Sequence, residues 1–491
     1  MITYNDYLEI DNTNISSVME FVRKAILEHK TTDLYQNAVV ADDYAKRLNT
    51  TIVQYQKLLY TITGKAIPDE YNANFKLASG FFKRFITQEN QYLLGNGVTW
   101  QYDRTGEKLG TDFDTKLQKA GREALKGAVS FGFFNKDHLD VFAITEFKPL
   151  YDEENGALMA GIRFWQIDST KPLRATFYEI DGYTEFIWDT RENALTDSKW
   201  TVVVDGQGYM QKRPYKLKFE QSEADGTEIY AGENYPTFPI VPLWGNPDHI
   251  SELVGLREQI DCYDLIKSGY ANTVDEGSII YWLIQNAGGM DDVDLVKFVE
   301  RIKTMHAATV GEDGGVGETH AEAHTIEPPY QSREALLDRL RSDLYEDSMS
   351  LDTKSIADGA VTATQIEAAY EPLNSKTDEF EYCVLEFLKG ILAVVGIKDE
   401  NPTFTRSLIV NRAEEIDSVL KCAEFLDEEY VAQKLLNILG DGDLVEEIMR
   451  RRKVQEAERN GFDEEEEEGE LPDEELDIDS EIDSLLAELE G

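Results

Sequence analysis

Helical and strand-like patterns occupy separate parts of this chain, and this separation constrains its fold more than any other feature. Apolar residues recur at helical spacing over 17–28, from about 74 to 94, and again from 253 onward. Between Trp100 and Trp244, short segments rich in β-branched and aromatic residues are punctuated by Asp-Gly turns. The pattern predicts an α+β protein with a mainly antiparallel β region, entered by a helix at about 114–129. The clearest expected strands are 163–167, 176–180, 184–188 and 199–204.

The two N-terminal helices have recognisable ends. Ser17 and Glu20 have the spacing of a capping box, which places the start of the first helix at Ser17. The second helix is expected to begin near Asn74 and to end at the glycines that follow residue 94. Its apolar face requires a partner helix.

Helical spacing returns after Pro247, with a glycine-rich acidic interruption at 311–317. Ser332 is the expected N-cap of a helix reaching about 349, and the segment 350–361 has no helical face and is expected to be a loop. The next helix extends toward Val395, about 50 Å if continuous, and Pro372 is expected to bend or break it. Three further helices are expected at 413–425, 428–439 and 444–459.

Acidic residues outnumber basic ones by 95 to 48 among the 491 residues, which leaves a formal charge of −47. A protein that grips DNA neutralises phosphates with clustered Lys and Arg, so tight, general nucleic-acid binding is not expected. Sixteen acidic residues and no Lys or Arg lie in 463–491, and repulsion at that density predicts a largely disordered tail. The basic clusters at 212–218 and 450–453 are interpreted as solvated faces of a strand and a helix.

No segment indicates export or membrane insertion. The N-terminal residues lack the basic and apolar regions of a signal peptide, and the longest apolar stretch, 391–397, is far shorter than a membrane span. Cys262, Cys383 and Cys422 are expected to be reduced thiols in the core of a soluble cytoplasmic protein.

No catalytic motif is found. The segment 311–319 has acidic residues where a phosphate-binding loop needs a lysine, and His320 and His324 enclose Glu322 in a pattern that differs from the zinc-protease helix. No catalytic residue, metal site or cofactor is therefore predicted. Two alternatives stay open: an acidic cytoplasmic scaffold or adaptor without a DNA role, and a metal-dependent hydrolase that uses carboxylates hidden in the acidic background.

Four colinear segments together resemble the portal proteins of tailed bacteriophages, in the branch found in long-tailed phages of Gram-positive bacteria. The segments are Phe81–Val98, Phe238–Ser268, Ile356–Glu381 and Thr403–Glu415. The resemblance implies a structural protein rather than an enzyme. It implies a dodecamer ring at one capsid vertex, with a channel for packaging and ejecting double-stranded DNA without sequence specificity. The implied partners are the terminase large subunit, the major capsid and scaffolding proteins and a head-completion adaptor, with assembly in the host cytoplasm, a final place in the virion and no membrane.

Laid on this sequence, the resemblance also implies a portal-type subunit with a β-rich wing, a helical stem, a clip insertion, a long kinked helix and a helical crown. The implied parts are the wing at 1–245, stem helices at 246–272 and 331–349, the clip at 273–330, the tunnel loop at 350–361, the kinked helix at 362–400, the crown at 401–462 and the acidic tail at 463–491.

The tunnel loop of the family lines the narrowest part of the channel, which makes Lys354 the candidate positive contact to DNA. The candidate channel residues are Ser350, Asp352, Lys354, Ser355, Asp358 and Gly359. The candidate stem contacts, expected to pack within and between subunits, are Leu336, Leu340 and Leu344. The net acidity fits a conduit, because a mildly repulsive wall lets a polyanion pass without trapping it.

Overall fold

The structure is a computed structural model. It describes residues 1–60, 65–70, 72–188, 200–202, 212–221, 228–276, 281–284, 321–324, 330–354, 363–406, 416, 419–422, 428–439, 448, 450 and 451. The chain divides into two units, Met1–Leu408 and Ile409–Gly491. In the second unit, α14 (Glu428–Leu439) has the bounds expected from the sequence.

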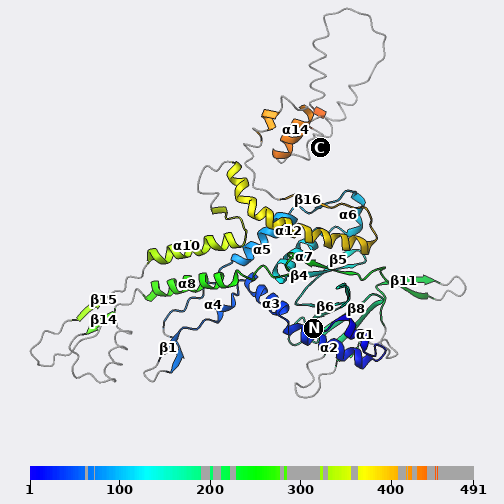
Figure 1. Cartoon of the computed structure of the whole chain (residues 1–491), viewed down its shortest axis with the longest axis horizontal. Helices are drawn as coiled ribbons and strands as arrows, with labels where there is room; N and C mark the ends of the chain where they lie inside the picture. Colours follow the sequence, from blue (N-terminus) through cyan, green and yellow to red (C-terminus); the bar gives the residue numbers. More distant parts are fainter. Residues whose placement is uncertain are drawn as a thin grey trace, which may run out of the picture. The chain divides into compact units, whose positions relative to one another are not determined.

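The first unit combines helices with antiparallel sheets (Figure 1). Its helices are α1 (Tyr4–Glu9), α2 (Ile15–Thr31), α3 (Asp33–Ala45), α4 (Thr50–Gln54), α5 (Phe81–Leu94), α6 (Asp103–Leu109), α7 (Phe113–Gly127), α8 (Arg257–Glu276), α10 (Tyr330–Asp347) and α12 (Ala363–Val395). Its strands are β1 (Leu58–Tyr60), β2 (Ala66–Pro68), β3 (Val98–Thr99), β4 (Val129–Asn135), β5 (His138–Ala143), β6 (Phe147–Tyr151), β7 (Leu158–Trp165), β8 (Leu173–Glu179), β9 (Gly182–Trp188), β10 (Trp200–Val202), β11 (Lys216–Gln221), β12 (Glu228–Glu233), β13 (Ile240–Trp244), β14 (Tyr281–Ile284), β15 (Ala321–His324) and β16 (Thr403–Phe404).

The predicted α+β class and the antiparallel middle region are confirmed. A five-stranded sheet has the order β10-β9-β8-β7-β6, and a three-stranded sheet has the order β13-β4-β5. The strand pairs of both sheets are antiparallel. The four strands expected from the sequence correspond to β7, β8, β9 and β10, and the expected entrance helix is α7.

Two apolar clusters hold the first unit together. One face of α2, with Val22 and Ala25 fully buried, packs on side chains of the five-stranded sheet such as Ile162 and Phe177. The larger cluster joins α3, α5, α7 and α12 to the three-stranded sheet. In it Phe387 of α12 lies against β4 at Gly132, where an added Cβ would meet the ring at 2.5 Å.

The predicted cap of α2 is wrong. The helix begins at Ile15, and the side chain of Asn14 accepts a hydrogen bond from the Ser16 N–H, so Asn14 is the N-cap. Asn is as favourable an N-cap as Ser. Because Asn14 caps the helix three residues earlier, Ser17 lies inside the helix and is not its N-cap. The apolar face read from the sequence is nevertheless the buried one, as Val18 and Ile26 show.

The predicted start of α5 is also wrong, because the residues before Phe81 are extended along α8. The N–H groups of Phe75, Leu77 and Ser79 donate to side-chain oxygens of α8 over 2.7, 3.0 and 2.9 Å. The acceptors are, in the same order, Asn272, Ser268 and Asp264. Two residues of an extended chain span about 6.6 Å, and four residues of a helix rise about 6 Å. The N–H groups of alternate residues in the extended segment therefore match side chains four residues apart on α8.

The prediction that all three cysteines are core residues is wrong for two of them. Cys383 is buried in α12, whereas Cys262 and Cys422 are exposed. Cys262 lies two residues from both Ile260 and Asp264, which are two of the buried residues of α8, and therefore on the opposite side of the helix. All three thiols are free.

Candidate channel loop and stem helices

Helices α8 and α10 form an antiparallel hairpin (Figure 1). Near the end of α8, the Tyr270 ring contacts the Tyr330 ring edge-on at 5.7 Å, and Thr273 accepts a hydrogen bond from Arg333 over 3.0 Å. At the other end, Gln259 of α8 is hydrogen-bonded to the carboxylate of α10's last residue. Beyond the helices, β14 and β15 pair in the insertion that joins them.

The apolar stripe predicted on α10 is buried only at its C-terminal end. Leu344 is fully buried, Leu340 is half-buried and Leu336 is 46% exposed. A single copy of the chain therefore leaves the outer part of this stripe uncovered. Contacts of these leucines between subunits stay a prediction.

The chain leaves α10 through a tightly bonded turn. Met349 adopts a left-handed conformation with φ of 52°, and the Ser350 N–H donates to the Tyr345 carbonyl over 3.1 Å. The Met349 N–H donates to the Glu346 carbonyl over 3.0 Å, and the two bonds together form a Schellman motif. This motif ends the helix and directs the chain into the segment expected to be the tunnel loop.

The first residues of that segment are anchored to α5 and α12. Leu351 is 5% exposed and belongs to a small cluster with Tyr92, Tyr370 and Leu373. Its carbonyl accepts a hydrogen bond from Gln88 Nε2 over 3.2 Å. The entrance to the loop is therefore part of the packed structure.

The structure brings Ser350, Asp352 and Lys354 together just after α10, and Ser355, Asp358 and Gly359 lie outside the described residues. Asp352 is ion-paired with Arg341 at 2.7 Å and accepts the Lys354 N–H over 3.0 Å. The Lys354 side chain is exposed. Arg341 thus offsets the negative charge nearest to Lys354.

A buried charge cluster that the sequence analysis missed lies behind this segment. Lys376 Nζ of α12 is 2.9 Å from a carboxylate oxygen of Glu89 on α5 and 2.6 Å from one of Glu252. It also donates to the Ser348 carbonyl at the end of α10 over 3.2 Å. Glu89 is 2% exposed, and burial raises its pKa to about 8 despite the nearby ammonium. The cluster joins four parts of the fold at the entrance to the loop.

A signal for this cluster was present in the sequence. Glu89 follows Phe82 and Ile86 by seven and three residues and precedes Leu93 by four, which places it on the buried face of α5. An acidic residue on such a face requires a cation or a proton. The identity of its partner, Lys376, depends on tertiary packing.

The long helix predicted behind the loop is α12. The helix is continuous through Pro372, and Figure 1 shows that it changes direction along its length. A proline removes one backbone hydrogen bond and pushes against the carbonyl four residues earlier, which accounts for a bend. Within the ranges that the structure describes, no helix has both the length and the apolar character required to cross a membrane.

A family model described as "Phage portal protein, SPP1 Gp6-like" matches residues 23–468. The chain belongs to this family of phage portal proteins. It is 26% identical over 241 residues to the portal protein of Clostridium phage phiCD119, covering 44% of the chain and 52% of that protein. It is 22% identical over 429 residues to the portal protein of Bacillus phage SPP1, covering 82% of the chain and 79% of that protein.

The family is structural, and its members are virion capsid components. Both relatives are phage portal proteins, and the family model spans most of the chain. The alignment with the clostridial phage protein spans about half of that protein's length. The resemblance stated from the sequence is therefore confirmed at the level of the family.

Proposed function

We propose that copies of this chain form a closed ring of twelve around an axial channel at one capsid vertex. Double-stranded DNA enters through this channel during packaging and leaves through it during ejection. The match to the portal family over most of the chain carries the proposal. The chain acts as a structural conduit rather than as an enzyme, and its partners are the terminase large subunit, the major capsid and scaffolding proteins and a head-completion adaptor.

The α8–α10 hairpin supports the assignment of the stem. Two antiparallel helices joined by an insertion with its own strand pair match the expected stem and clip. We assign the wing to 1–245, the two stem segments to 246–272 and 331–349, the clip to 273–330, the tunnel loop to 350–361 and the kinked helix to 362–400. The first stem segment was expected to be helical throughout, but it is helical only from Arg257, where α8 begins. The crown at 401–462 and the acidic tail at 463–491 complete the subunit.

The loop after α10 is assigned to the narrowest part of the channel. Its first residues are anchored by Leu351 and Asp352, so substitutions further along the loop should leave the ring intact. Twelve copies of Lys354 would then give the acidic conduit a ring of weak positive contacts. Such contacts reach the phosphates and no base edges, so they act on DNA of any sequence and weaken as the salt concentration rises.

Native mass spectrometry of the purified full chain tests the ring. A closed assembly near twelve copies is expected, with a central hole in negative-stain images. A stable monomer at micromolar concentration would contradict the proposal and favour an acidic scaffold or adaptor. Leu336→Asp is expected to weaken the assembly by placing charge on the uncovered part of the α10 stripe, and exposed Leu8→Asp on α1 is the matched control.

A further inference from the structure

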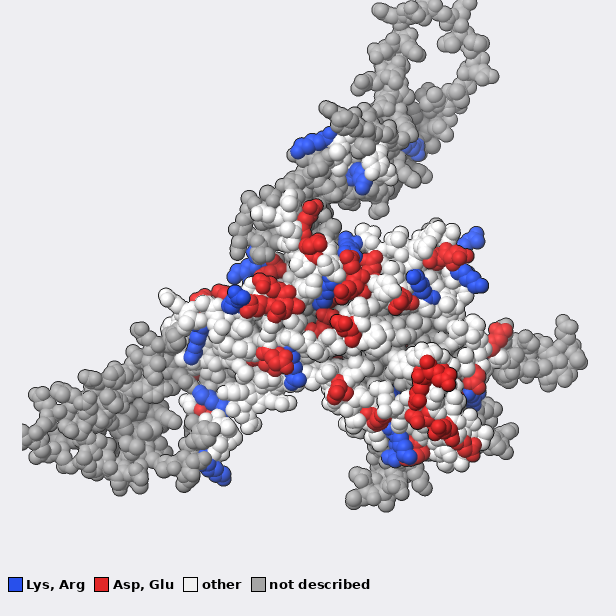
Figure 2. All heavy atoms as spheres, in the orientation of Figure 1, with Lys and Arg blue, Asp and Glu red and all other residues white. Residues whose placement is uncertain are grey.

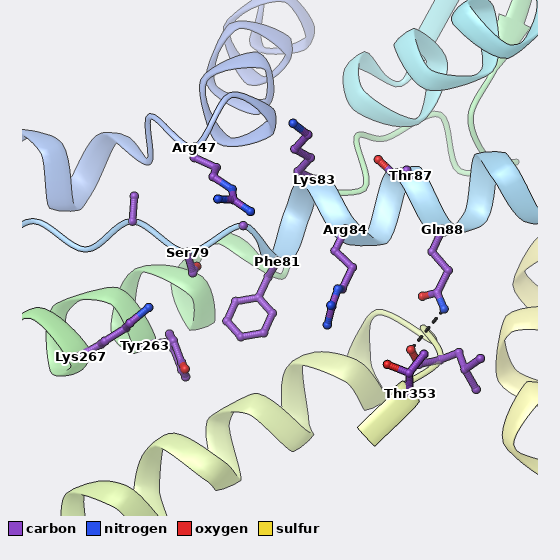
Figure 3. A pocket seen from close by; sticks show the side chains of 13 residues that line it. Arg47, Ser79, Phe81, Lys83, Arg84, Thr87, Gln88, Tyr263, Lys267 and Thr353 are labelled. Carbon is purple, nitrogen blue, oxygen red and sulfur yellow. Dashed lines mark hydrogen bonds between the residues drawn. The ribbon is translucent and has the colours of Figure 1, made fainter. Parts of the chain in front are cut away.

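A cleft of about 670 Å³ lies between the start of α5, α8 and the first residues after α10 (Figure 3). Four basic side chains line it: Arg47, Lys83, Arg84 and Lys267. None of the thirteen lining residues is acidic. Elsewhere, Figure 2 shows acidic side chains spread over the visible face of the described residues. The cleft is therefore a local concentration of positive charge in a strongly acidic chain.

Within the described part of the chain, none of these four basic side chains forms an ion pair with a carboxylate. Among the described residues, Arg47 and Lys83 have no ion-pair partner, and Arg84 donates to the hydroxyl of Tyr345, which carries no charge. Asp264 is buried one turn from Lys267, but its oxygens accept hydrogen bonds from the Asn49 side chain and the Ser79 N–H. Mutual repulsion of these cations favours the binding of an anion.

The backbone at the cleft reinforces this preference. Helix α5 starts there with Gly80 as its N-cap and with no side-chain cap, so its first N–H groups and the positive end of its dipole face the cleft. An added Cβ at Gly80 would lie 2.6 Å from Arg47 Nε, which shows how closely the guanidinium approaches the helix start. Ser79, which is 8% exposed, also lines the cleft, and its N–H donates to the buried Asp264 over 2.9 Å.

We propose that this cleft binds phosphate groups in series, as found in a nucleoside triphosphate or along a nucleic-acid strand. The volume is in the range of small-molecule sites and exceeds what one phosphate needs. In Figure 3, Arg84 and Lys267 extend from different helices on either side of the Phe81 ring, so a single phosphate would leave some of the cations unpaired. The Phe81 and Tyr263 rings, 5.0 Å apart, offer aromatic surface for a base.

Calorimetric titration of the full chain at low salt tests the proposal with inorganic triphosphate, ATP and short duplex DNA as probes. Arg47→Gln with Lys267→Gln removes two cations from the cleft. Lys24→Gln with Lys116→Gln changes the net charge equally but acts on lysines paired with Glu20 and Asp112 outside the cleft. We expect the wild type and the control to bind alike and the cleft variant to bind at least about tenfold more weakly.

A second variant separates a loss of binding from a loss of folding. Lys83→Gln alters an exposed side chain of α5 and is expected to weaken binding several-fold while leaving the thermal unfolding midpoint unchanged. If triphosphate and ATP bind, the site recognises free phosphates. If only duplex DNA binds, the site recognises the DNA backbone, and this second outcome is the one that rests on the proposed channel function.

Two results would overturn the phosphate site. One is the absence of binding by any probe to the wild type, and the other is equal binding by the cleft variant and the control. If no probe binds and the cleft variant instead changes the copy number, the cations meet an acidic surface of a second copy. The copy number of the wild type is measured in parallel, so failure of the phosphate site and failure of the ring are distinguishable.

Discussion

Replacing Lys376 by Met should destabilise the fold severely, because the ammonium is the shared partner of two buried carboxylates. The Lys376 side chain is 12% exposed, Glu89 2% and Glu252 15%. Methionine keeps much of the volume of the side chain but leaves both carboxylates without a cation and the Ser348 carbonyl without its 3.2 Å donor. Removing one partner of a buried ion pair costs about 3–5 kcal/mol.

The cost of Lys376→Met should depend on pH. Without the ammonium, burial and the charge of Glu252 raise the pKa of Glu89 further, so the carboxyl takes a proton in the folded state. A protonated Glu89 no longer carries an unpaired charge. The loss of stability should therefore reach about 3–5 kcal/mol near pH 9 and be smaller near pH 6.

Urea unfolding followed by tryptophan fluorescence at both pH values measures this loss. Lys24→Met is the control, because Lys24 is 63% exposed and its nitrogen lies 3.7 Å from Glu20, so its removal should cost less than about 0.5 kcal/mol. Adding Glu89→Gln to Lys376→Met should recover part of the stability by removing one of the two charges. A loss below about 1 kcal/mol at pH 9 would show that the cluster is not the buried ionic contact described here.

The remaining predictions concern pH, the loop and the tail. Burial raises the folded-state pKa of Glu89 from 4.5 to about 8, so the stability that Glu89 contributes is fully present below pH 4.5 and is lost as the pH rises through 8. The unfolding midpoint should therefore decline over this pH range, and Glu89→Gln should flatten the decline. Lys354→Glu, or removal of three or four residues from 355–361, should preserve ring assembly and reduce DNA-filled capsids in a complementation assay, whereas full packaging would exclude the loop as the constriction. Removal of 463–491 should leave circular dichroism and solubility unchanged, and an insoluble product would contradict the predicted disorder.

The spacing of apolar residues was sufficient to predict an element where that element is stabilised by burial of its own apolar face. The buried side of α2, the position of α7 and the strands β7 to β9 follow from residue spacing, because each side chain that faces the core repeats at the period of its element. The bounds of α14 were predictable for the same reason. Such patterns can be recognised without knowing which surface the apolar face packs against.

Elements that depend on distant polar partners could not be predicted in this way. The residues before Phe81 contain a helical pattern, yet their N–H groups bond to side chains of α8 about two hundred residues away. Phe75, which falls within the helix expected from about Asn74, is 46% exposed. Of the candidate loop residues, the sequence indicated that Asp352 and Lys354 lie near each other, but the ion pair of Asp352 with Arg341 depends on how the chain turns after α10.

Several contacts fix the residues at the entrance to the proposed tunnel loop. Leu351 is packed among aromatic side chains, Asp352 is paired with Arg341, and the Ser348 carbonyl is held by Lys376. Displacing residues 348–352 would break these contacts together and expose charges that are now buried, at a cost of several kcal/mol. Substitutions at 348–352 should therefore lower the stability of the fold, whereas substitution of the exposed Lys354 side chain should leave stability unchanged and act on DNA passage through the proposed channel.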